Sequence, residues 1–437
     1  MKFDVHHLWF LGDPTAPRFV GTLRLVQSGK GVSLQYGPQW LAAGFALSED
    51  LPLVDIEHLP RGRLAAGAAM AAGAVDDARP DRWGERVIQY IDRPKRLSLM
   101  EYLYFAGDDR FGALGVSTSD QHYLPRPGGP LPRLAEVQAI SEVVAKVAAS
   151  EAITDTERRV LVSGGSFGGA KPKALVEIGG EQWVVKFYNG EPVDSPLVEH
   201  ATMTLAAQAG IRVAETRALP LVGQHAIAVR RFDRGEGRRI HSISAGTALR
   251  AATAAGQEPD MGYPALAQLL RRTGVAADGA NMADAAELFR RMVFNILVDN
   301  TDDHEKNHAL LAVAPSSNGR FRLAPAYDVL PSNSGQGFQE FICGDMGRDS
   351  TLANAMSQCQ AFGLARAEAA TAVVEVIGVV DGWRDHFAAA GVTPADIEQL
   401  AERIDGDELL AQRKGFDATG HAAPPPRRVR RGPFNRS

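Results

Sequence analysis

One stretch of the sequence, residues 283–298, constrains the fold more than any other. In ADAAELFRRMVFNILV the apolar residues recur with a period of about 3.6, which predicts a helix with one buried face; they stand at positions 285, 288, 289, 292, 293, 296 and 297. The polar run NTDDHEKN follows at residues 300–307. Polar side chains gathered where an element ends are a common location of functional sites. The sequence therefore predicts a site at the C-terminal end of a core helix.

The rest of the chain divides into a β-rich part and a helical part. Residues 1–60 hold short apolar runs separated by Gly/Pro turns, which predict strands. Residues 64–104 and 135–150 have helical patterns, and the proline-rich segment 125–133 between them predicts a boundary. Beyond about residue 245 the pattern is helical again. Together these patterns predict an α+β fold.

A hairpin, a helix and a further strand are predicted in the middle of the chain. The runs KALVEI and WVVKFY flank Gly179 and Gly180, and a Gly-Gly pair between two such runs predicts a β-hairpin. A helix is expected over residues 198–210 and a strand over residues 225–232.

Composition limits the class of protein. The 437 residues carry a net charge of −5, so no overall basic field exists to hold nucleic acid, and such a contact would be local or made by a partner. Two cysteines, Cys343 and Cys359, are too few for a disulfide framework and suit a reducing compartment. The N-terminus lacks a signal-peptide core, and the longest apolar run, residues 64–75, is shorter than the roughly 18–20 residues of a membrane span. We therefore expect a soluble cytoplasmic protein.

Three residues beyond the predicted core helix have the spacing of a phosphate-transfer site. Asp302 and Asn307 are five positions apart, as are the base Asp and the metal-binding Asn of the protein-kinase catalytic loop. Asp328 follows a strand-like run, where a kinase carries a second Mg²⁺-binding carboxylate. The alternatives are a solvated loop with a capping Asp, and a turn Asp.

Two upstream residues add a possible ion pair. Lys186 lies in the apolar run WVVKFY, where a kinase Lys reaches the phosphates of ATP, and Glu199 stands thirteen positions further on, near the start of a predicted helix. The alternatives are a Lys that extends its ammonium group to solvent and a carboxylate favoured by the helix dipole.

A Gly-rich stretch, SGGSFGGAKPK at residues 163–173, precedes this pair. Its four glycines free backbone N–H groups to face phosphate oxygens, although it is neither a Walker A loop nor the G-x-G-x-x-G loop of ordinary protein kinases. Ser163 and Ser166 could themselves accept phosphate, and Lys173 could add positive charge near a nucleotide. A flexible hinge and a surface Lys are the alternatives. The order of these five parts, rather than any one of them, predicts a phosphotransferase.

The sequence resembles the HipA family of toxin–antitoxin serine/threonine kinases. The matching stretches are SFGGAKPKAL, WVVKF, VEHATMTLAAQAGI, AVRRFDR, FNILVDNTDDHEKN and LAPAYDVLPS. The resemblance implies a bilobal protein-kinase-like fold with a β-rich small lobe and an all-α large lobe. The expected division is an N-terminal β-rich subdomain at 1–130, a nucleotide-binding small lobe at 131–244 and a helical catalytic lobe at 245–420. The Pro/Arg-rich composition at the C-terminal end predicts a disordered basic tail at 421–437.

The resemblance also implies roles for single residues. Asp302 is the expected catalytic base, and Asn307 and Asp328 are the expected Mg²⁺ ligands. The implied ATP-binding set is Ser166, Gly168, Gly169, Lys173, Lys186, Glu199, His304 and Lys306, of which the last two have no firm role. Ser166, with Ser163 as a second candidate, is the expected autophosphorylation site, where phosphate would eject the loop and inactivate the enzyme. Asp303, where some members carry Gly, leaves open which of the two neighbouring carboxylates is the base.

Partners and a physiological role follow from the same resemblance. A small helix-turn-helix antitoxin of the HipB type would bind the chain and make the DNA contact. The family's substrates are aminoacyl-tRNA synthetases, whose phosphorylation would arrest growth and favour persistence. Two alternatives stay open: a small-molecule phosphotransferase of the same fold, and a catalytically weak co-repressor that only binds the antitoxin.

Overall fold

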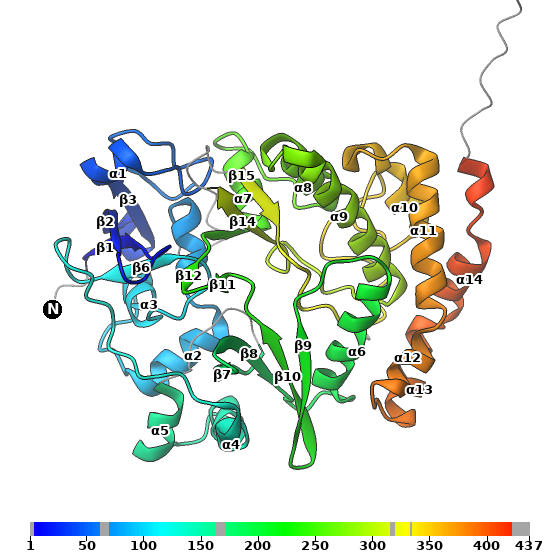
Figure 1. Cartoon of the computed structure of the whole chain (residues 1–437), viewed down its shortest axis with the longest axis horizontal. Helices are drawn as coiled ribbons and strands as arrows, with labels where there is room; N and C mark the ends of the chain where they lie inside the picture. Colours follow the sequence, from blue (N-terminus) through cyan, green and yellow to red (C-terminus); the bar gives the residue numbers. More distant parts are fainter. Residues whose placement is uncertain (1–3, 62–69, 163–170, 315–319, 333, 422–437) are drawn as a thin grey trace, which may run out of the picture.

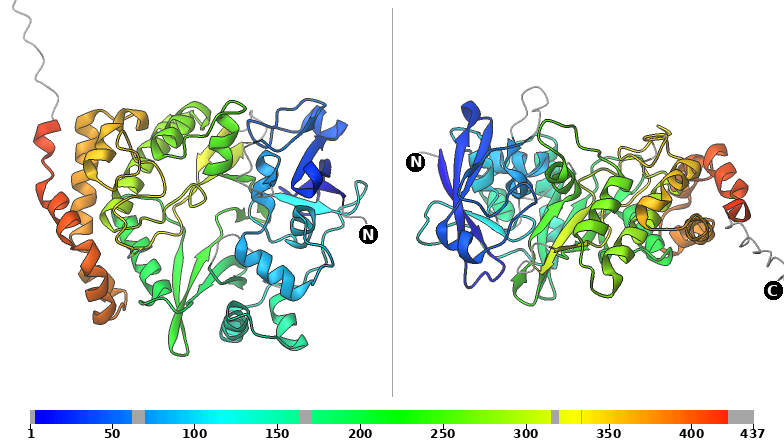
Figure 2. Two further views of the ribbon diagram at one scale, coloured as in Figure 1. Left: turned by 180° about the vertical axis from the view of Figure 1, so that it is seen from behind. Right: turned by 90° about the horizontal axis from the view of Figure 1, so that it is seen from above.

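The structure, a computed structural model, describes residues 4–61, 70–162, 171–314, 320–332 and 334–421 (Figure 1). The view from above in Figure 2 shows the N-terminal sheet at one end of an elongated molecule and the C-terminal helices at the other. None of the described helices combines the length and the apolar character of a membrane span.

The N-terminal region is built on a six-stranded sheet. The strand order is β4-β3-β2-β1-β6, and the short β5 pairs in parallel with β3. The strands are β1 Val5–Phe10, β2 Arg18–Val26, β3 Gly31–Tyr36, β4 Glu57–His58, β5 Met70–Ala71 and β6 Leu114–Ser117. The helices of this region are α1 Pro38–Ala43, the 3-10 helix η2 Gly73–Ala78, α2 Arg82–Ile91 and α3 Leu99–Phe105.

A four-stranded antiparallel sheet follows, with the order β7-β8-β10-β9. Gly179 and Gly180 form the β7–β8 turn with φ of +64° and +82°, which glycine adopts without a steric cost. The strands are β7 Lys173–Ile178, β8 Glu181–Phe187, β9 Thr216–Leu221 and β10 Gln224–Arg230, and the helices around them are α4 Val137–Ala148, α5 Asp155–Val162 and α6 Ser195–Gln208. Helix α6 begins after Asp194, whose carboxylate accepts the backbone N–H of Leu197 at 3.3 Å.

The C-terminal region is mainly helical. Its helices are α7 Ala245–Ala252, α8 Tyr263–Thr273, α9 Ala280–Leu297, α10 Leu352–Ser357, α11 Arg366–Val380, α12 Trp383–Ala389, α13 Pro394–Ile404 and α14 Asp407–Gly415. A small antiparallel sheet lies among them, formed by β13 Ser242–Ser244, β14 Ala309–Ala314 and β15 Arg320–Leu323. A two-stranded ribbon, β11 Arg234–Gly235 with β12 Arg238–Arg239, precedes it.

The second sheet shares a hydrophobic core with helices from both sides of the chain. Trp183 and Val185 of β8 belong to one buried cluster with Val144 of α4 and with Trp83 and Val87 of α2. Helix α2 belongs to the N-terminal region in sequence, yet it covers the second sheet. Burying a large apolar side chain contributes about 1.5–3 kcal/mol, so this shared core joins the two regions firmly.

The α+β class and most of the predicted elements agree with the structure, and two predictions are wrong. The helical reading of residues 64–104 fails at Met70–Ala71, which form the strand β5, whereas Gly73–Ala78 form the 3-10 helix η2. The backbone N–H of Ala72 donates to Val32 of β3 at 2.9 Å, so sheet pairing overrides the helix propensity of an Ala-rich run. The helical reading beyond residue 245 fails for β14 and β15 and for the described residues of 324–351, which form turns and isolated bridges. The lobe boundaries stay a prediction, and the tail beyond residue 421 lies outside the described residues.

Candidate active site

The loop over residues 298–308 connects α9 to β14 and carries the predicted catalytic residues. Asp299 adopts a φ of +57° directly after the helix. The hydroxyl of Ser332 then accepts two backbone N–H groups of the loop, from Thr301 at 2.7 Å and from Asp302 at 3.1 Å. The loop backbone is thereby fixed while the side chain of Asp302 stays exposed.

The neighbouring carboxylates of Asp302 and Asp303 have opposite environments. Asp303 is 2% exposed, accepts a hydrogen bond from the Tyr263 hydroxyl, and has its Oδ2 2.8 Å from His308 Nε2. Burial acts to raise the pKa of Asp303, but His308 and Tyr263 outweigh it and hold that pKa below its ordinary value. Asp302 is accessible to solvent, but the surrounding protein removes part of its hydration and raises its pKa, and the ring of His304 acts against this. A general base must reach its substrate, and this geometry favours Asp302 over Asp303.

Lys186 connects the second sheet to α6 and to the segment after β15. Its Nζ lies 2.6 Å from Oε1 of Glu199 and 2.7 Å from Oδ1 of Asp328. The side chain of Lys186 is 9% exposed, so it does not extend its ammonium group to solvent. Glu199, 2% exposed, lies beyond the first turn of α6, so the helix dipole alone does not account for it. Burial acts to lower the pKa of Lys186, but the carboxylates of Asp328 and Glu199 outweigh burial and hold it above its ordinary value.

Asp328 is held in a backbone conformation that non-glycine residues rarely adopt, with a φ of +58°. Such a conformation persists only where the surroundings fix it. Burial acts to raise the pKa of Asp328, but Lys186 and Lys173 hold it well below its ordinary value. The preceding residue, Tyr327, donates its hydroxyl to the carbonyl of Lys306 at 2.7 Å. The Asp328 segment is therefore attached to both the second sheet and the catalytic loop.

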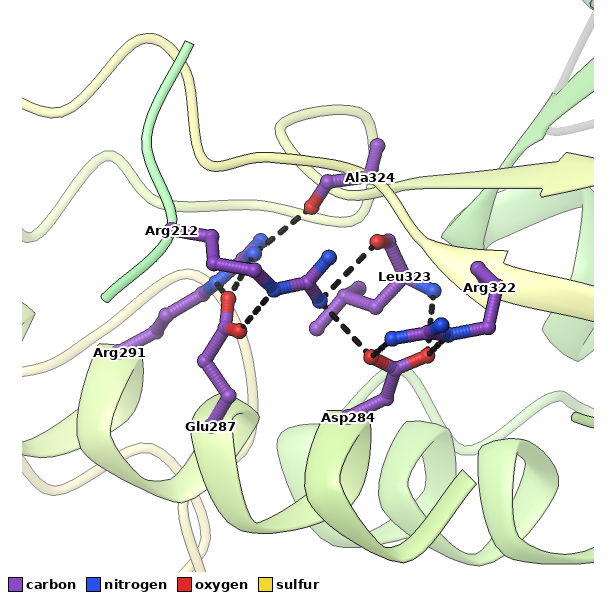
Figure 3. A network of polar contacts seen from close by, with 7 residues as sticks. All are labelled: Arg212, Asp284, Glu287, Arg291, Arg322, Leu323 and Ala324. Atoms are coloured by element: carbon purple, nitrogen blue, oxygen red, sulfur yellow. Dashed lines mark hydrogen bonds and ion pairs between the residues drawn. The ribbon is translucent and has the colours of Figure 1, made fainter. Parts of the chain in front are cut away.

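A buried charge network between α9 and β15 holds the start of this segment (Figure 3). Asp284 of α9 is 1% exposed. Its carboxylate accepts Nε and Nη2 of Arg322 at 2.7 and 2.9 Å, Nη2 of Arg212 at 2.8 Å and the backbone N–H of Leu323 at 3.0 Å. This carboxylate thus fixes both the side chains and the backbone at the end of β15.

The second half of the network lies one turn further along α9. Arg291, whose side chain is 3% exposed, bonds to Glu287 and donates to the carbonyl of Ala324 at 2.7 Å (Figure 3). Ala324 stands four residues before Asp328. Helix α9, which leads into the catalytic loop, therefore also positions the backbone that precedes Asp328.

Lys173 lies directly across from Lys186 in the pairing of β7 with β8. It is 5% exposed, which rules out the surface Lys that was its alternative. Burial and the neighbouring ammonium of Lys186 lower the pKa of Lys173 to about 8. The sheet therefore presents two adjacent lysines beside the carboxylate of Asp328.

The remaining predicted residues of the catalytic loop have different roles. Asn307 is 8% exposed, and its Nδ2 contacts the carbonyl of Asp302 at 3.4 Å, which leaves the amide oxygen as the atom that could face a cation. The ring of His304 accepts the backbone N–H of Lys306 at 3.2 Å. The ammonium of Lys306 donates to Asp81 of the N-terminal region at 2.7 Å.

Four predicted residues of the Gly-rich stretch lie outside the described residues: Ser163, Ser166, Gly168 and Gly169.

The donor atoms here fit a Mg²⁺ ion that is shared with a nucleotide. Asn307 and Asp328 offer an amide and a carboxylate oxygen, and Mg²⁺ is commonly held by one or two carboxylates together with substrate phosphates and water. Within the described part of the chain, no three His, Cys, Asp or Glu side chains are gathered as a metal site of their own. The amide oxygen of Asn307 and the carboxylate of Asp328 fit a metal that phosphate oxygens help to hold.

Three residues of the site could not be assigned a role from the sequence. Ser332 lies in the stretch LAPAYDVLPS, but no local pattern shows that it accepts N–H groups thirty positions upstream. Tyr263 contacts Asp303 across forty positions, again with no local signal. Asp81 is recognisable as a helix-capping type of residue before α2, yet nothing in the sequence places it beside Lys306.

A comparison with protein-family models shows to which family this chain belongs. The family model for the HipA-like C-terminal domain matches residues 165–383, which is half of the chain (219 of 437 residues). The chain belongs to the HipA family. The matched range contains the residues just described: Lys173, Lys186, Glu199, Asp302, Asn307 and Asp328.

Three individual proteins illustrate what the chain is similar to. A putative kinase of Sinorhizobium fredii strain NGR234, Y4dM, is 31% identical over 165 residues, which are 35% of this chain and 37% of that protein. The match thus spans little more than a third of the curated relative. The HipA chain solved from Shewanella oneidensis MR-1, in a complex with HipB and operator DNA, superposes with a TM-score of 0.62 and 18% identity, over 94% of this chain and 97% of its own. The fold of the present chain is therefore that of HipA across nearly its whole length. The proinflammatory kinase CtkA of Helicobacter pylori gives a TM-score of 0.41 and 13% identity, over 58% of this chain and 91% of its own.

Proposed function

We propose that this HipA-family protein is an ATP- and Mg²⁺-dependent serine/threonine protein kinase. One observation carries the proposal: the ammonium of Lys186 lies between the carboxylates of Glu199 and Asp328, and the exposed Asp302 stands on the adjoining loop. A strand Lys paired with a helix Glu, together with a metal-binding Asp, is the arrangement that protein kinases require for phosphoryl transfer.

The chemistry divides among these residues as follows. Lys186 and Lys173 neutralise phosphate charge, and the Lys186–Glu199 pair keeps the ammonium in place. Asn307 and Asp328 would hold Mg²⁺, which supplies charge neutralisation at the phosphates when it is bound. Asp302 accepts the proton of the attacking serine or threonine hydroxyl, and its raised pKa brings it closer to the working pH of a base.

The proposal extends to a role as a toxin with an antitoxin partner. The solved HipA of Shewanella oneidensis is found with HipB and operator DNA. We propose a helix-turn-helix partner of the same type here, which would make the DNA contact, and the net charge of −5 supports leaving that contact to a partner. A translation-related protein such as an aminoacyl-tRNA synthetase is the proposed substrate, and Ser166 or Ser163 is the proposed autophosphorylation site.

The test compares two neighbouring carboxylates in one assay. Transfer of labelled phosphate from ATP to the protein itself and to a bacterial lysate is measured for the wild type, Asp302→Asn and Asp303→Asn. We expect Asp302→Asn to remove transfer and to leave the unfolding midpoint in urea unchanged. Asp303→Asn should lower the free energy of unfolding by about 1–3 kcal/mol, because it disturbs a buried hydrogen-bonded carboxylate.

Each alternative gives a different outcome of this assay. A wild type that labels no protein and no metabolite would overturn the kinase proposal in favour of an antitoxin-binding co-repressor. Label on a small metabolite alone would indicate a small-molecule phosphotransferase. Mass spectrometry of the labelled protein should find phosphate on Ser166 or Ser163, and a site elsewhere would contradict the proposed inactivation of the Gly-rich loop.

A further inference from the structure

The segment from the end of η2 to the start of α2 places three N-terminal residues around the candidate active site. The indole N–H of Trp83 donates to the carbonyl of Lys173 at 2.8 Å. The carboxylate of Asp77 accepts the backbone N–H and the hydroxyl of Ser244 at 2.7 and 2.8 Å. The short segment 77–83 therefore contacts both the second sheet, at Lys173, and the start of the helical region, at Ser244.

The third contact reaches the catalytic loop itself. Asp81 accepts the ammonium of Lys306 at 2.7 Å. Lys306 immediately precedes Asn307, and its backbone carbonyl accepts the hydroxyl of Tyr327, which immediately precedes Asp328. Asp81 thus holds Lys306, which is next to Asn307 in the chain and is hydrogen-bonded to the residue before Asp328.

The geometry indicates a positioning role rather than a contribution to stability. The side chains of Lys306 and Asp81 are 42% and 23% exposed, and ion pairs this accessible stabilise a protein by at most about 1 kcal/mol. Burial raises the pKa of Glu85, one turn further along α2, and Lys306 is one of the cations that act against this. Asp81, the acidic partner of Lys306, immediately precedes α2, and α2 packs on the second sheet.

We propose that Asp81 is a positioning residue for the phosphotransfer site: through Lys306 it sets the relative placement of Asn307 and Asp328. The inference rests on the proposed function, because those two residues matter together only if they share a Mg²⁺ ion. Groups that orient metal ligands from outside typically alter metal affinity by 10–100-fold when they are lost.

The experiment measures binding and catalysis in the full-length protein. Calorimetry gives the affinity for a non-hydrolysable ATP analogue over a range of Mg²⁺ concentrations, and phosphate transfer is followed over the same range. The variants are Asp81→Asn, Lys306→Gln and the double variant. The control is Glu49→Gln, which breaks another pair between the N-terminal and helical regions, with Arg272, at 2.8 Å.

We expect Asp81→Asn to raise the Mg²⁺ concentration for half-maximal analogue binding roughly tenfold, and transfer to recover at high Mg²⁺. The double variant should be no worse than either single variant, because both changes remove one interaction. Glu49→Gln should stay within about twofold of the wild type, as expected for a distant surface pair.

Three results would overturn the inference. These are an Asp81→Asn protein with an unchanged Mg²⁺ requirement, losses in the two single variants that multiply in the double variant, and an equal loss in Glu49→Gln. Failure of the proposed function looks different, because the wild type would then show neither transfer nor Mg²⁺-dependent binding of the analogue.

Discussion

Lys186 is an ammonium group enclosed by two carboxylates, with its side chain 9% exposed and that of Glu199 2% exposed. Removing one partner of such a pair leaves a buried charge without compensation and typically costs about 3–5 kcal/mol. We therefore predict that Lys186→Met lowers the free energy of unfolding by this amount. The double variant Lys186→Met, Glu199→Leu should recover a large part of the loss, because apolar side chains replace both charges.

Urea unfolding at pH 7 measures both values, and transfer should be absent in both variants. The comparison separates stability from function, since only stability is restored in the double variant. Equal losses in the single and double variants would contradict the account of Glu199 as a buried charge that needs its partner.

The lowered pKa of Lys173 predicts that nucleotide binding depends on pH. In the free protein its pKa is lowered to about 8 from 10.5, by burial and by Lys186. A phosphate placed beside it favours the ammonium and raises this pKa in the complex. Affinity is therefore highest below pH 8 and falls as the pH rises through about 8, by on the order of tenfold per pH unit at most. Titrations of an ATP analogue between pH 7.5 and 9 should show this fall, and Lys173→Met should bind more weakly with a flat profile.

Single residues also show how far the sequence alone can lead. Lys186 and Glu199 were predicted as partners because a strand Lys followed by a helix Glu is the arrangement of protein kinases, and the structure brings them together. The distinction between Asp302 and Asp303 could not be predicted, because it depends on Tyr263 and His308. Tyr263 opens a different helix, and only the folded chain brings it to the loop.

At the scale of elements, α9 does more than bury an apolar face. Two of its carboxylates and Arg291 form the network that holds β15 and Ala324 (Figure 3). Arg291→Met would leave the Ala324 carbonyl without this donor and Glu287 without its buried partner. We expect a loss of about 2–4 kcal/mol in the free energy of unfolding, together with weaker binding of an ATP analogue.

Arg212→Met is the matched control for this prediction. Its side chain joins the same network but is 44% exposed, so its loss should cost no more than about 1 kcal/mol. Urea unfolding ranks the two variants. If Arg212→Met were the more damaging change, the buried half of the network would not be what fixes the Asp328 segment.

The elements themselves were predictable where one period dominated. Strands β7 and β8, with their Gly-Gly turn, and helix α9 follow directly from local pattern. The strand β5 did not, because an Ala-rich run has the same local preference whether or not a neighbouring strand is available for pairing. Long-range pairing of this kind leaves no mark on the local sequence.

At the scale of the whole molecule, the N-terminal region and the second sheet are joined by a second buried contact. Asp233, 1% exposed, accepts hydrogen bonds from Arg231, Arg234 and the backbone N–H of Gly112. Arg231 donates in turn to the carbonyl of Asp109 at 2.7 Å. The stretch AVRRFDR, which helped to indicate the family, thus ties the end of β10 to the loop before β6.

These contacts bear on the boundary predicted near residue 130. That boundary rested on a proline-rich segment, which marks a connection but says nothing about which side-chain surfaces meet across it. Trp83 and Val87 lie before the boundary, yet they complete the core of the second sheet. The boundary predicted from the sequence near residue 130 therefore does not coincide with a boundary between separately packed cores.

We predict that a chain starting at residue 131 does not fold cooperatively. It would expose the face of the second sheet that α2 covers and leave the Arg231–Asp233 pair without its partners around Gly112. Circular dichroism and urea unfolding should show a broad transition and no binding of an ATP analogue. Adding residues 1–130 as a separate chain should restore both, because the missing surface is then supplied. A sharp transition and full nucleotide binding by the shorter chain alone would show that the N-terminal region is an appendage, and the shared core would then not be required for the nucleotide site.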